Sequence, residues 1–77
     1  MFTIGEVAQR VGVRSSTVRY YERRGILPPA VRRKNGYRSY TDKSIKLLLF
    51  TTRARSLGIT LKEIKFLLNL ILAGQKP

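Results

Sequence analysis

Apolar residues recur at helical spacing near the start of the chain. Four of them occupy positions i, i+3, i+4 and i+7 and so share one face of a helix: Ile4, Val7, Ala8 and Val11. Thr3 and Glu6 have the spacing of a capping box, in which each side chain satisfies the other residue's backbone N–H. Gly12 can adopt the left-handed conformation that ends a helix. The pattern predicts a first helix between Thr3 and Gly12.

A second helix is predicted directly after this stop. Ser15 or Ser16 is expected to cap it, and Gly25 to end it. Two short helices joined by a turn that contains glycine form a helix-turn-helix, in which the second helix enters a DNA major groove. The exposed face of that helix must carry donors for phosphates and base edges, and the candidates are Ser16, Thr17, Arg19, Tyr20, Tyr21, Arg23 and Arg24.

The adjacent tyrosines on this helix cannot share one environment. Neighbouring helical residues point about 100° apart, so one ring should pack inward while the other faces out. We expect Tyr20 to lie mainly in the core and Tyr21 to donate its hydroxyl to a phosphate.

The segment after the second helix predicts a small β-hairpin. Pro28 and Pro29 exclude helix, and Asn35 and Gly36 favour a type I′ turn with about three residues in each arm. The hairpin is basic, carrying Arg32, Arg33, Lys34, Tyr37 and Arg38. Neighbouring cations repel one another and so destabilise the hairpin, and a nearby anion would reduce this repulsion. A basic hairpin beside a helix-turn-helix is a wing.

Two further helices complete the pattern. The third should start at Thr41 and stop at Gly58, with its apolar face formed by Ile45, Leu48, Leu49 and Thr52. Arg53 and Arg55 lie near its end, where cations also complement the helix dipole. Thr60 and Glu63 form a second capping box, and the helix that follows is apolar on nearly all sides, which predicts burial against another surface.

These elements predict a mainly α fold with a small β-hairpin, a winged helix-turn-helix followed by a two-helix pair. We expect one domain over residues 1–77, with the helix-turn-helix at about 3–25, the wing at about 30–40 and the helix pair at about 41–73.

Charge and composition narrow the function. Sixteen Lys and Arg against four Asp and Glu give a net charge of +12, which calls for an anionic partner, while 43% apolar residues favour a folded domain. The chain has no Cys and no His, so we expect no enzyme, no cofactor and no metal site. The uncharged stretch from Phe66 to Gly74 is far below the roughly 20 residues of a membrane span, and we expect a cytoplasmic protein without a membrane partner.

Seven short motifs occur in order along the chain: IleGlyGluValAla at 4–8, GlyVal at 12–13, ThrValArgTyrTyrGlu at 17–22, GlyIleLeuProPro at 25–29, AsnGlyTyrArgSerTyr at 35–40, ArgAlaArgSerLeuGly at 53–58 and ThrLeuLysGluIle at 60–64. Together they resemble the MerR family of bacterial transcription regulators over almost the whole chain. Position 14, often a capping Ser or Thr in the family, is Arg14 here, and without Cys no metal can be sensed through thiolates.

The resemblance implies promoter DNA as the partner, bound by a homodimer that the full-length protein forms through a C-terminal helix missing here. This dimer would affect RNA polymerase indirectly, by bending and untwisting the duplex. The family's long dimerisation helix and effector segment are expected to be absent from this chain. By position, Arg19 and Tyr21 match DNA contacts of the second helix, Arg32, Tyr37 and Arg38 match contacts of the wing, and Arg55 matches a phosphate contact.

The predicted function is therefore sequence-specific binding of double-stranded DNA at promoters, with transcription regulation as its outcome. The predicted contact residues are Ser16, Thr17, Arg19, Tyr20, Tyr21, Arg32, Arg33, Tyr37, Arg38 and Arg55. An excisionase-like architectural factor without a sensor is the alternative, and whether the chain is a fragment or a complete gene product stays open. A basic amphipathic membrane-surface binder is more distant, because most cations lie outside the fourth helix.

Overall fold

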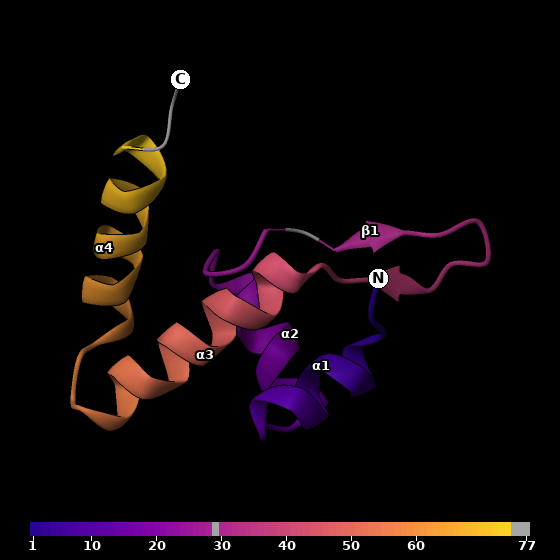
Figure 1. Cartoon of the computed structure of the whole chain (residues 1–77), viewed down its shortest axis with the longest axis horizontal. Coiled ribbons are helices and arrows are strands. Elements are labelled where there is room, and N and C mark those ends of the chain that lie inside the picture. The colour runs from indigo at the N-terminus through magenta and orange to yellow at the C-terminus, as the bar shows by residue number, and fades with distance from the viewer. Residues whose placement is uncertain (29, 75–77) are drawn as a thin grey trace.

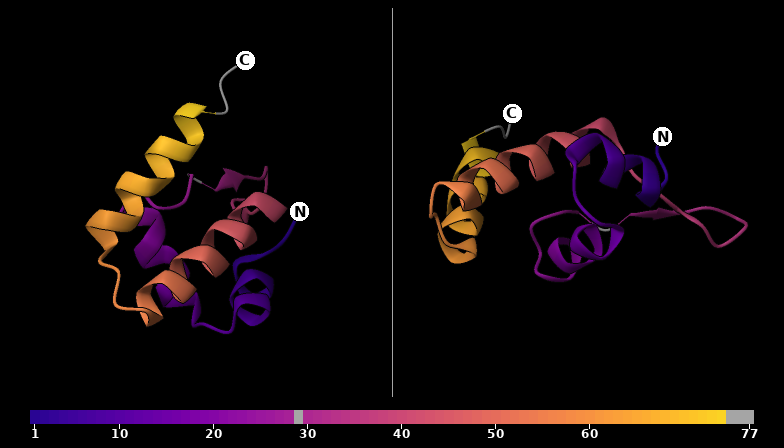
Figure 2. Two further views of the ribbon diagram at one scale, coloured as in Figure 1. Left: turned by 60° about the vertical axis from the view of Figure 1, so that its left-hand side comes forward. Right: turned by 90° about the horizontal axis from the view of Figure 1, so that it is seen from below.

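Four helices and one hairpin make up the computed structural model, which describes residues 1–28 and 30–74 (Figure 1). In order they are α1 (Ile4–Val11), α2 (Ser15–Arg23), β1 (Val31–Arg32), β2 (Arg38–Ser39), α3 (Asp42–Ser56) and α4 (Leu61–Gly74). Helix α3 packs against both α1 and α4, and the hairpin and α4 project at opposite ends of the molecule (Figures 1 and 2). The predicted fold class is confirmed; the helix break expected at Pro29 lies outside the described residues.

Helix α1 begins and ends as its local chemistry predicts. The Thr3 hydroxyl accepts from the Glu6 N–H at 3.1 Å, and the Glu6 carboxylate accepts from the Thr3 N–H at 2.8 Å. The hydrogen bond from the Thr3 backbone holds the pKa of Glu6 below its ordinary value. Gly12 ends the helix with φ of 84°. Thr60 and Glu63 form the same reciprocal pair at the start of α4, so both predicted capping boxes are confirmed.

The start of α2 differs from the prediction. Arg14 occupies the N-cap position and makes no side-chain capping bond, and both Ser15 and Ser16 already belong to the helix. The Arg14 carbonyl accepts from the Thr17 N–H at 3.0 Å and from the Val18 N–H at 3.3 Å, so the N-cap lies one residue before Ser15 and two before Ser16. The expectation of a serine cap was wrong.

The hairpin turn also differs from the prediction. Gly36 takes a positive φ of 85°, but no non-glycine residue among those described does, so Asn35 does not form a type I′ turn with it. The Gly36 N–H donates to the Arg33 carbonyl at 2.9 Å and the Arg33 N–H donates to the Tyr37 carbonyl at 2.8 Å, a three-residue loop with glycine at its left-handed position. The paired arms are two residues long, with Val31 opposite Ser39 and Arg32 opposite Arg38.

The N-terminus supports this short hairpin, which the sequence pattern did not reveal. Phe2 and Tyr40 exchange two backbone hydrogen bonds of 2.8 Å, so the residue after β2 is held by the segment before α1. A lone two-stranded hairpin is marginal in water. The Phe2–Tyr40 bridge therefore connects the base of the wing to the segment that leads into α1.

The core lies where α1, α2, α3 and α4 converge. Its largest fully buried side chains are Val7, Val18, Tyr40, Leu48, Thr51 and Ile64. On α3 the buried line is Ser44, Leu48, Thr51 and Ala54, so of the predicted face Leu48 is buried while Ile45, Leu49 and Thr52 are half-buried.

On α4, Ile64 and Leu68 are buried, while Phe66, Leu67, Leu70 and Ile71 are exposed, so within the described residues the outer apolar face of this helix lacks the second surface that the sequence pattern predicts for it. Within residues 1–28 and 30–74 no helix has the length and apolar character to cross a bilayer.

Candidate nucleic-acid interface

Helix α2 divides its side chains between the core and solvent. Val18 is fully buried and Tyr21 is 8% exposed, while Tyr20 is 40% exposed. Our assignment of the two tyrosine rings was therefore wrong: Tyr21 packs inward and Tyr20 faces out. The helical spacing i, i+3 from Val18 places Tyr21 on the buried stripe, and this signal was present in the sequence.

The exposed positions of α2 include most of the predicted contact residues. Ser16, Arg19 and Arg23 are exposed, and Thr17 is half-buried in the first turn. The ring of Tyr20 lies 5.5 Å from that of Tyr21 and under the Arg24 guanidinium at 5.9 Å.

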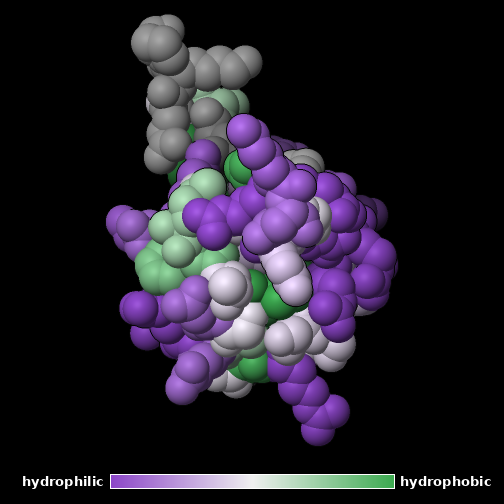
Figure 3. Space-filling view, turned by 90° about the vertical axis from the view of Figure 1, so that its right-hand side faces the viewer, coloured by the Kyte–Doolittle hydropathy of each residue, from purple (hydrophilic) through white to green (hydrophobic). Residues whose placement is uncertain are grey.

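Arginines from α2 and from the wing line one concave surface. It consists of two adjoining hollows that share Arg19 and Arg38, and we call it the arginine recess. The first hollow is lined by Thr3, Ile4, Arg19, Arg32, Gly36, Tyr37 and Arg38, and the second by Arg19, Glu22, Arg23 and Arg38. Hydrophilic side chains cover much of this end of the molecule (Figure 3). The structure thus brings together predicted residues that are up to 19 positions apart in the chain.

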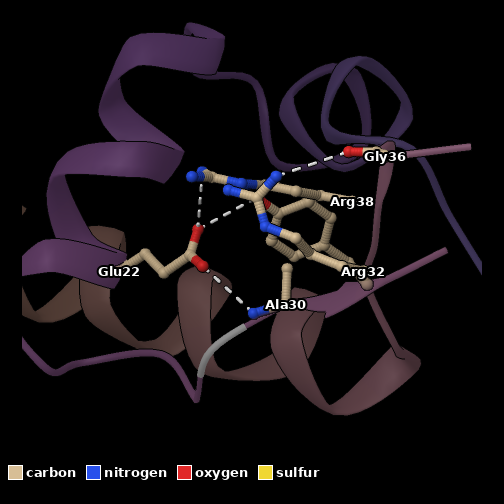
Figure 4. Close-up of polar contacts among 6 residues, drawn as sticks. Glu22, Ala30, Arg32, Gly36 and Arg38 are labelled. Carbon is tan, nitrogen blue, oxygen red and sulfur yellow. Dashed lines mark hydrogen bonds and ion pairs between the residues drawn. The ribbon is translucent and has the colours of Figure 1, made fainter. Parts of the chain in front are cut away.

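A single carboxylate joins the recess to the base of the wing. Glu22 Oε2 accepts from the Ala30 N–H at 3.0 Å, and Glu22 Oε1 accepts from the Tyr40 hydroxyl at 3.0 Å (Figure 4). Arg38 Nη1 lies 3.5 Å from the same Oε1. The sequence pattern predicted no role for Glu22 beyond its place in the ThrValArgTyrTyrGlu motif. Its three partners lie far from it along the chain, so no short-range signal connects them.

Tyr40 is the buried member of this network. Its side chain is 1% exposed, and burial, followed by its hydrogen bond to Glu22, raises the pKa of the Tyr40 phenol above its ordinary value. The phenol therefore stays protonated at neutral pH and keeps its hydroxyl available as a donor to Glu22.

The wing residues face solvent. Tyr37 is 71% exposed, Arg32 and Arg33 are exposed, and Arg32 Nη1 lies 3.5 Å from the Gly36 carbonyl. Arg38 is partly shielded, with 37% of its side chain exposed. These positions leave the guanidinium groups accessible to an anion at the hairpin.

Arg55 does not belong to the arginine recess. It belongs to the last turn of α3, and that end of the helix lies away from the hairpin (Figure 1). Its Nη1 donates to the Ile59 carbonyl at 3.3 Å. This bond braces the turn between α3 and α4. The phosphate contact expected from Arg55 stays a prediction.

Several curated bacterial proteins are similar in sequence to this chain. The family model described as "MerR HTH family regulatory protein" matches residues 2–70. The chain is 44% identical over 70 residues to the mercuric resistance operon regulatory protein of Bacillus cereus, covering 91% of this chain and 53% of that protein. It is 40% identical over 67 residues to the transcriptional regulator CueR of Salmonella typhimurium, covering 87% of this chain and 49% of that protein. The chain spans about half the length of these relatives.

Solved structures share the fold. HiNmlR, described as a MerR family regulator lacking the sensor domain and bound to promoter DNA, matches with a TM-score of 0.87 and 30% identity over 96% of this chain and 56% of that one. The transcription regulator PbrR691 from Ralstonia metallidurans CH34, solved with lead(II), matches with a TM-score of 0.89 and 36% identity over 100% of this chain and 60% of that one.

Proposed function

Because this chain belongs to the MerR HTH family of regulatory proteins, we propose that it binds promoter DNA and regulates transcription. Helix α2 enters a major groove and the wing lies along the neighbouring sugar-phosphate backbone. The observation that carries this proposal is the arginine recess, in which Arg19 and Arg23 of α2 and Arg32 and Arg38 of the wing line one concave surface.

The chemistry of the recess suits a duplex. Arginine binds phosphate oxygens and the guanine edge through two parallel hydrogen bonds, whereas a lone point charge selects no orientation. Contacts of the wing to phosphates would supply affinity, and side chains of α2 would read bases. A net charge of +12 adds attraction at longer range.

We further propose that the protein acts as a homodimer and affects RNA polymerase indirectly, through bending and untwisting of the promoter. The family resemblance supports this, and DNA deformation carries specificity without added protein contacts. The bacterial chromosome lies in the cytoplasm, which we propose as the site of action. We also propose that the chain catalyses no reaction, since it has neither Cys nor His.

A binding experiment tests the proposal. Duplexes are selected from a random pool, and affinity for the selected duplex is measured by fluorescence anisotropy over a salt series. If about five cations neutralise phosphates, log K should fall with log salt at a slope of roughly −4 to −5. The same titration with vesicles of acidic lipid should give weaker binding. Affinity that does not change with salt, or equal affinity for vesicles and duplex, would overturn the proposal.

A further inference from the structure

Glu22 is an acidic residue beside three arginines on a surface proposed to meet a polyanion. By charge alone it should weaken DNA binding. We infer that Glu22 is instead a positioning residue for DNA binding, whose carboxylate fixes the wing against α2 and orients Arg38. The inference rests on the proposed function and names a residue that enables it without touching DNA.

The contacts of Glu22 reach both arms of the wing. Ala30 comes directly before β1 and Tyr40 directly after β2, and each donates a hydrogen bond of 3.0 Å to a different oxygen of the carboxylate. One side chain on α2 therefore clamps the two ends of the hairpin at once. Because the hairpin has only two paired residues in each arm, its own ladder cannot fix its direction relative to α2.

The low solvent exposure and the charge of the Glu22 carboxylate strengthen these hydrogen bonds. The Glu22 side chain is 15% exposed, so water competes little for its oxygens. Hydrogen bonds to an ionised acceptor are roughly twice as strong as neutral ones. A neutral amide at position 22 would offer one acceptor oxygen in place of two and could not keep both arms bonded with equal strength.

Arg38 links Glu22 to the surface that we propose to contact DNA. Its Nη1 is 3.5 Å from Glu22 Oε1 while 37% of its side chain stays exposed. A guanidinium has five N–H donors in a rigid plane, so one edge can face Glu22 while the others remain available to a phosphate. Glu22 thereby reduces the number of Arg38 orientations that binding would otherwise have to select.

Charge and positioning give opposite predictions for Glu22→Gln. If Glu22 acts only through its charge, the variant should bind DNA more tightly, because one repulsion is removed. If it positions the wing, the variant should bind about tenfold more weakly. Asp42→Asn is the matched control: it also removes one negative charge, from an exposed position at the start of α3 outside the recess. It should bind as tightly as the parent or slightly more so.

A distance measurement reports the wing directly. The chain has no Cys, so Gln9→Cys on α1 and Lys34→Cys at the wing loop introduce two unique sites for nitroxide labels. Dipolar spectroscopy of the labelled parent should give one narrow distance distribution, and the added Glu22→Gln change should broaden it. A structural role confined to the core would leave this distribution unchanged.

The outcomes separate the inference from the proposed function. If the parent chain shows no preference for duplex DNA, the function fails. If the parent binds and Glu22→Gln binds as tightly as Asp42→Asn, or keeps the narrow distribution, the inference is overturned and the function stands. If circular dichroism shows that Glu22→Gln does not fold, Tyr40→Phe decides by the same two readouts: it retains the buried ring, removes one donor to Glu22, and should bind two- to fivefold more weakly with a broader distribution.

Discussion

Tyr21 and Tyr20 are neighbours on α2, yet truncation of each should have very different effects. Tyr21 is 8% exposed within the core, and removal of a buried aromatic ring costs about 3–5 kcal/mol. A chain of 77 residues has a total stability of about 4–12 kcal/mol, so Tyr21→Ala should remove a large part of it. At roughly 4–8 °C per kcal/mol, the Tm should fall by at least about 12 °C.

Tyr20→Ala is the control for this prediction. It removes a 40% exposed ring, its contact with Tyr21 and its cation-π contact with Arg24. The aromatic pair is worth about 0.5–1.5 kcal/mol and an exposed cation-π contact about 0.5–1 kcal/mol, so the total loss should be about 1–2.5 kcal/mol, below the loss expected for Tyr21→Ala. Urea titration followed by circular dichroism at 222 nm measures both variants under identical salt.

Tyr21→Phe separates packing from DNA contact. It retains the buried ring, so its stability should stay within about 1 kcal/mol of the parent, while any phosphate bond of the hydroxyl is lost. A Tyr20→Ala variant that proved less stable than Tyr21→Ala would refute the orientation of α2 and, with it, the surface proposed to face DNA.

The other predictions concern the recess, the turn and a cap. Arg19→Ala should weaken duplex binding by about 1–3 kcal/mol in anisotropy titrations, and Lys46→Ala, an exposed change on α3 outside the recess, should not; equal losses would exclude a specific contact. Gly36→Ala should destabilise the chain by about 1–2 kcal/mol in urea, because its φ of 85° is strained for alanine although nothing within 4 Å would meet the Cβ. The pKa of Glu6 is lower in the folded chain than its ordinary value of 4.5. The contribution of Glu6 to the free energy of unfolding is therefore fully present above pH 4.5 and is lost as the pH falls through the pKa of the folded state. Thr3→Ala should flatten that part of a stability–pH curve, and an unchanged curve would contradict the cap.

Features that depend on residues a few positions apart could be predicted from the sequence. The Thr3–Glu6 and Thr60–Glu63 capping boxes form as expected, and Gly12 takes its predicted left-handed conformation. Both partners of each bond lie within one helical turn, so spacing alone determines whether they can meet. The same holds for the choice of elements, which follows hydrophobic periodicity.

Local signals failed where two conformations have similar local energies. Either serine or Arg14 could precede α2, and Asn35 tolerates more than one turn type. The inward face of α2 follows the i, i+3 spacing of Val18 and Tyr21, a pattern that the two adjacent tyrosines by themselves do not show. The loop is closed by hydrogen bonds from Arg33 to Tyr37 and from Gly36 to Arg33, which involve residues on either side of the Asn35–Gly36 pair.

The sequence by itself determined the helices, the basic hairpin and the excess of positive charge. Tertiary structure alone decided that Glu22 meets Ala30 and Tyr40, which follow it by 8 and 18 residues, and that Phe2 pairs with Tyr40. A carboxylate on an isolated helix has no preferred partner, because its bonds to distant groups form only after packing has excluded water and fixed the backbone. The direction of the wing, and therefore the shape of the arginine recess, is a property of the folded chain.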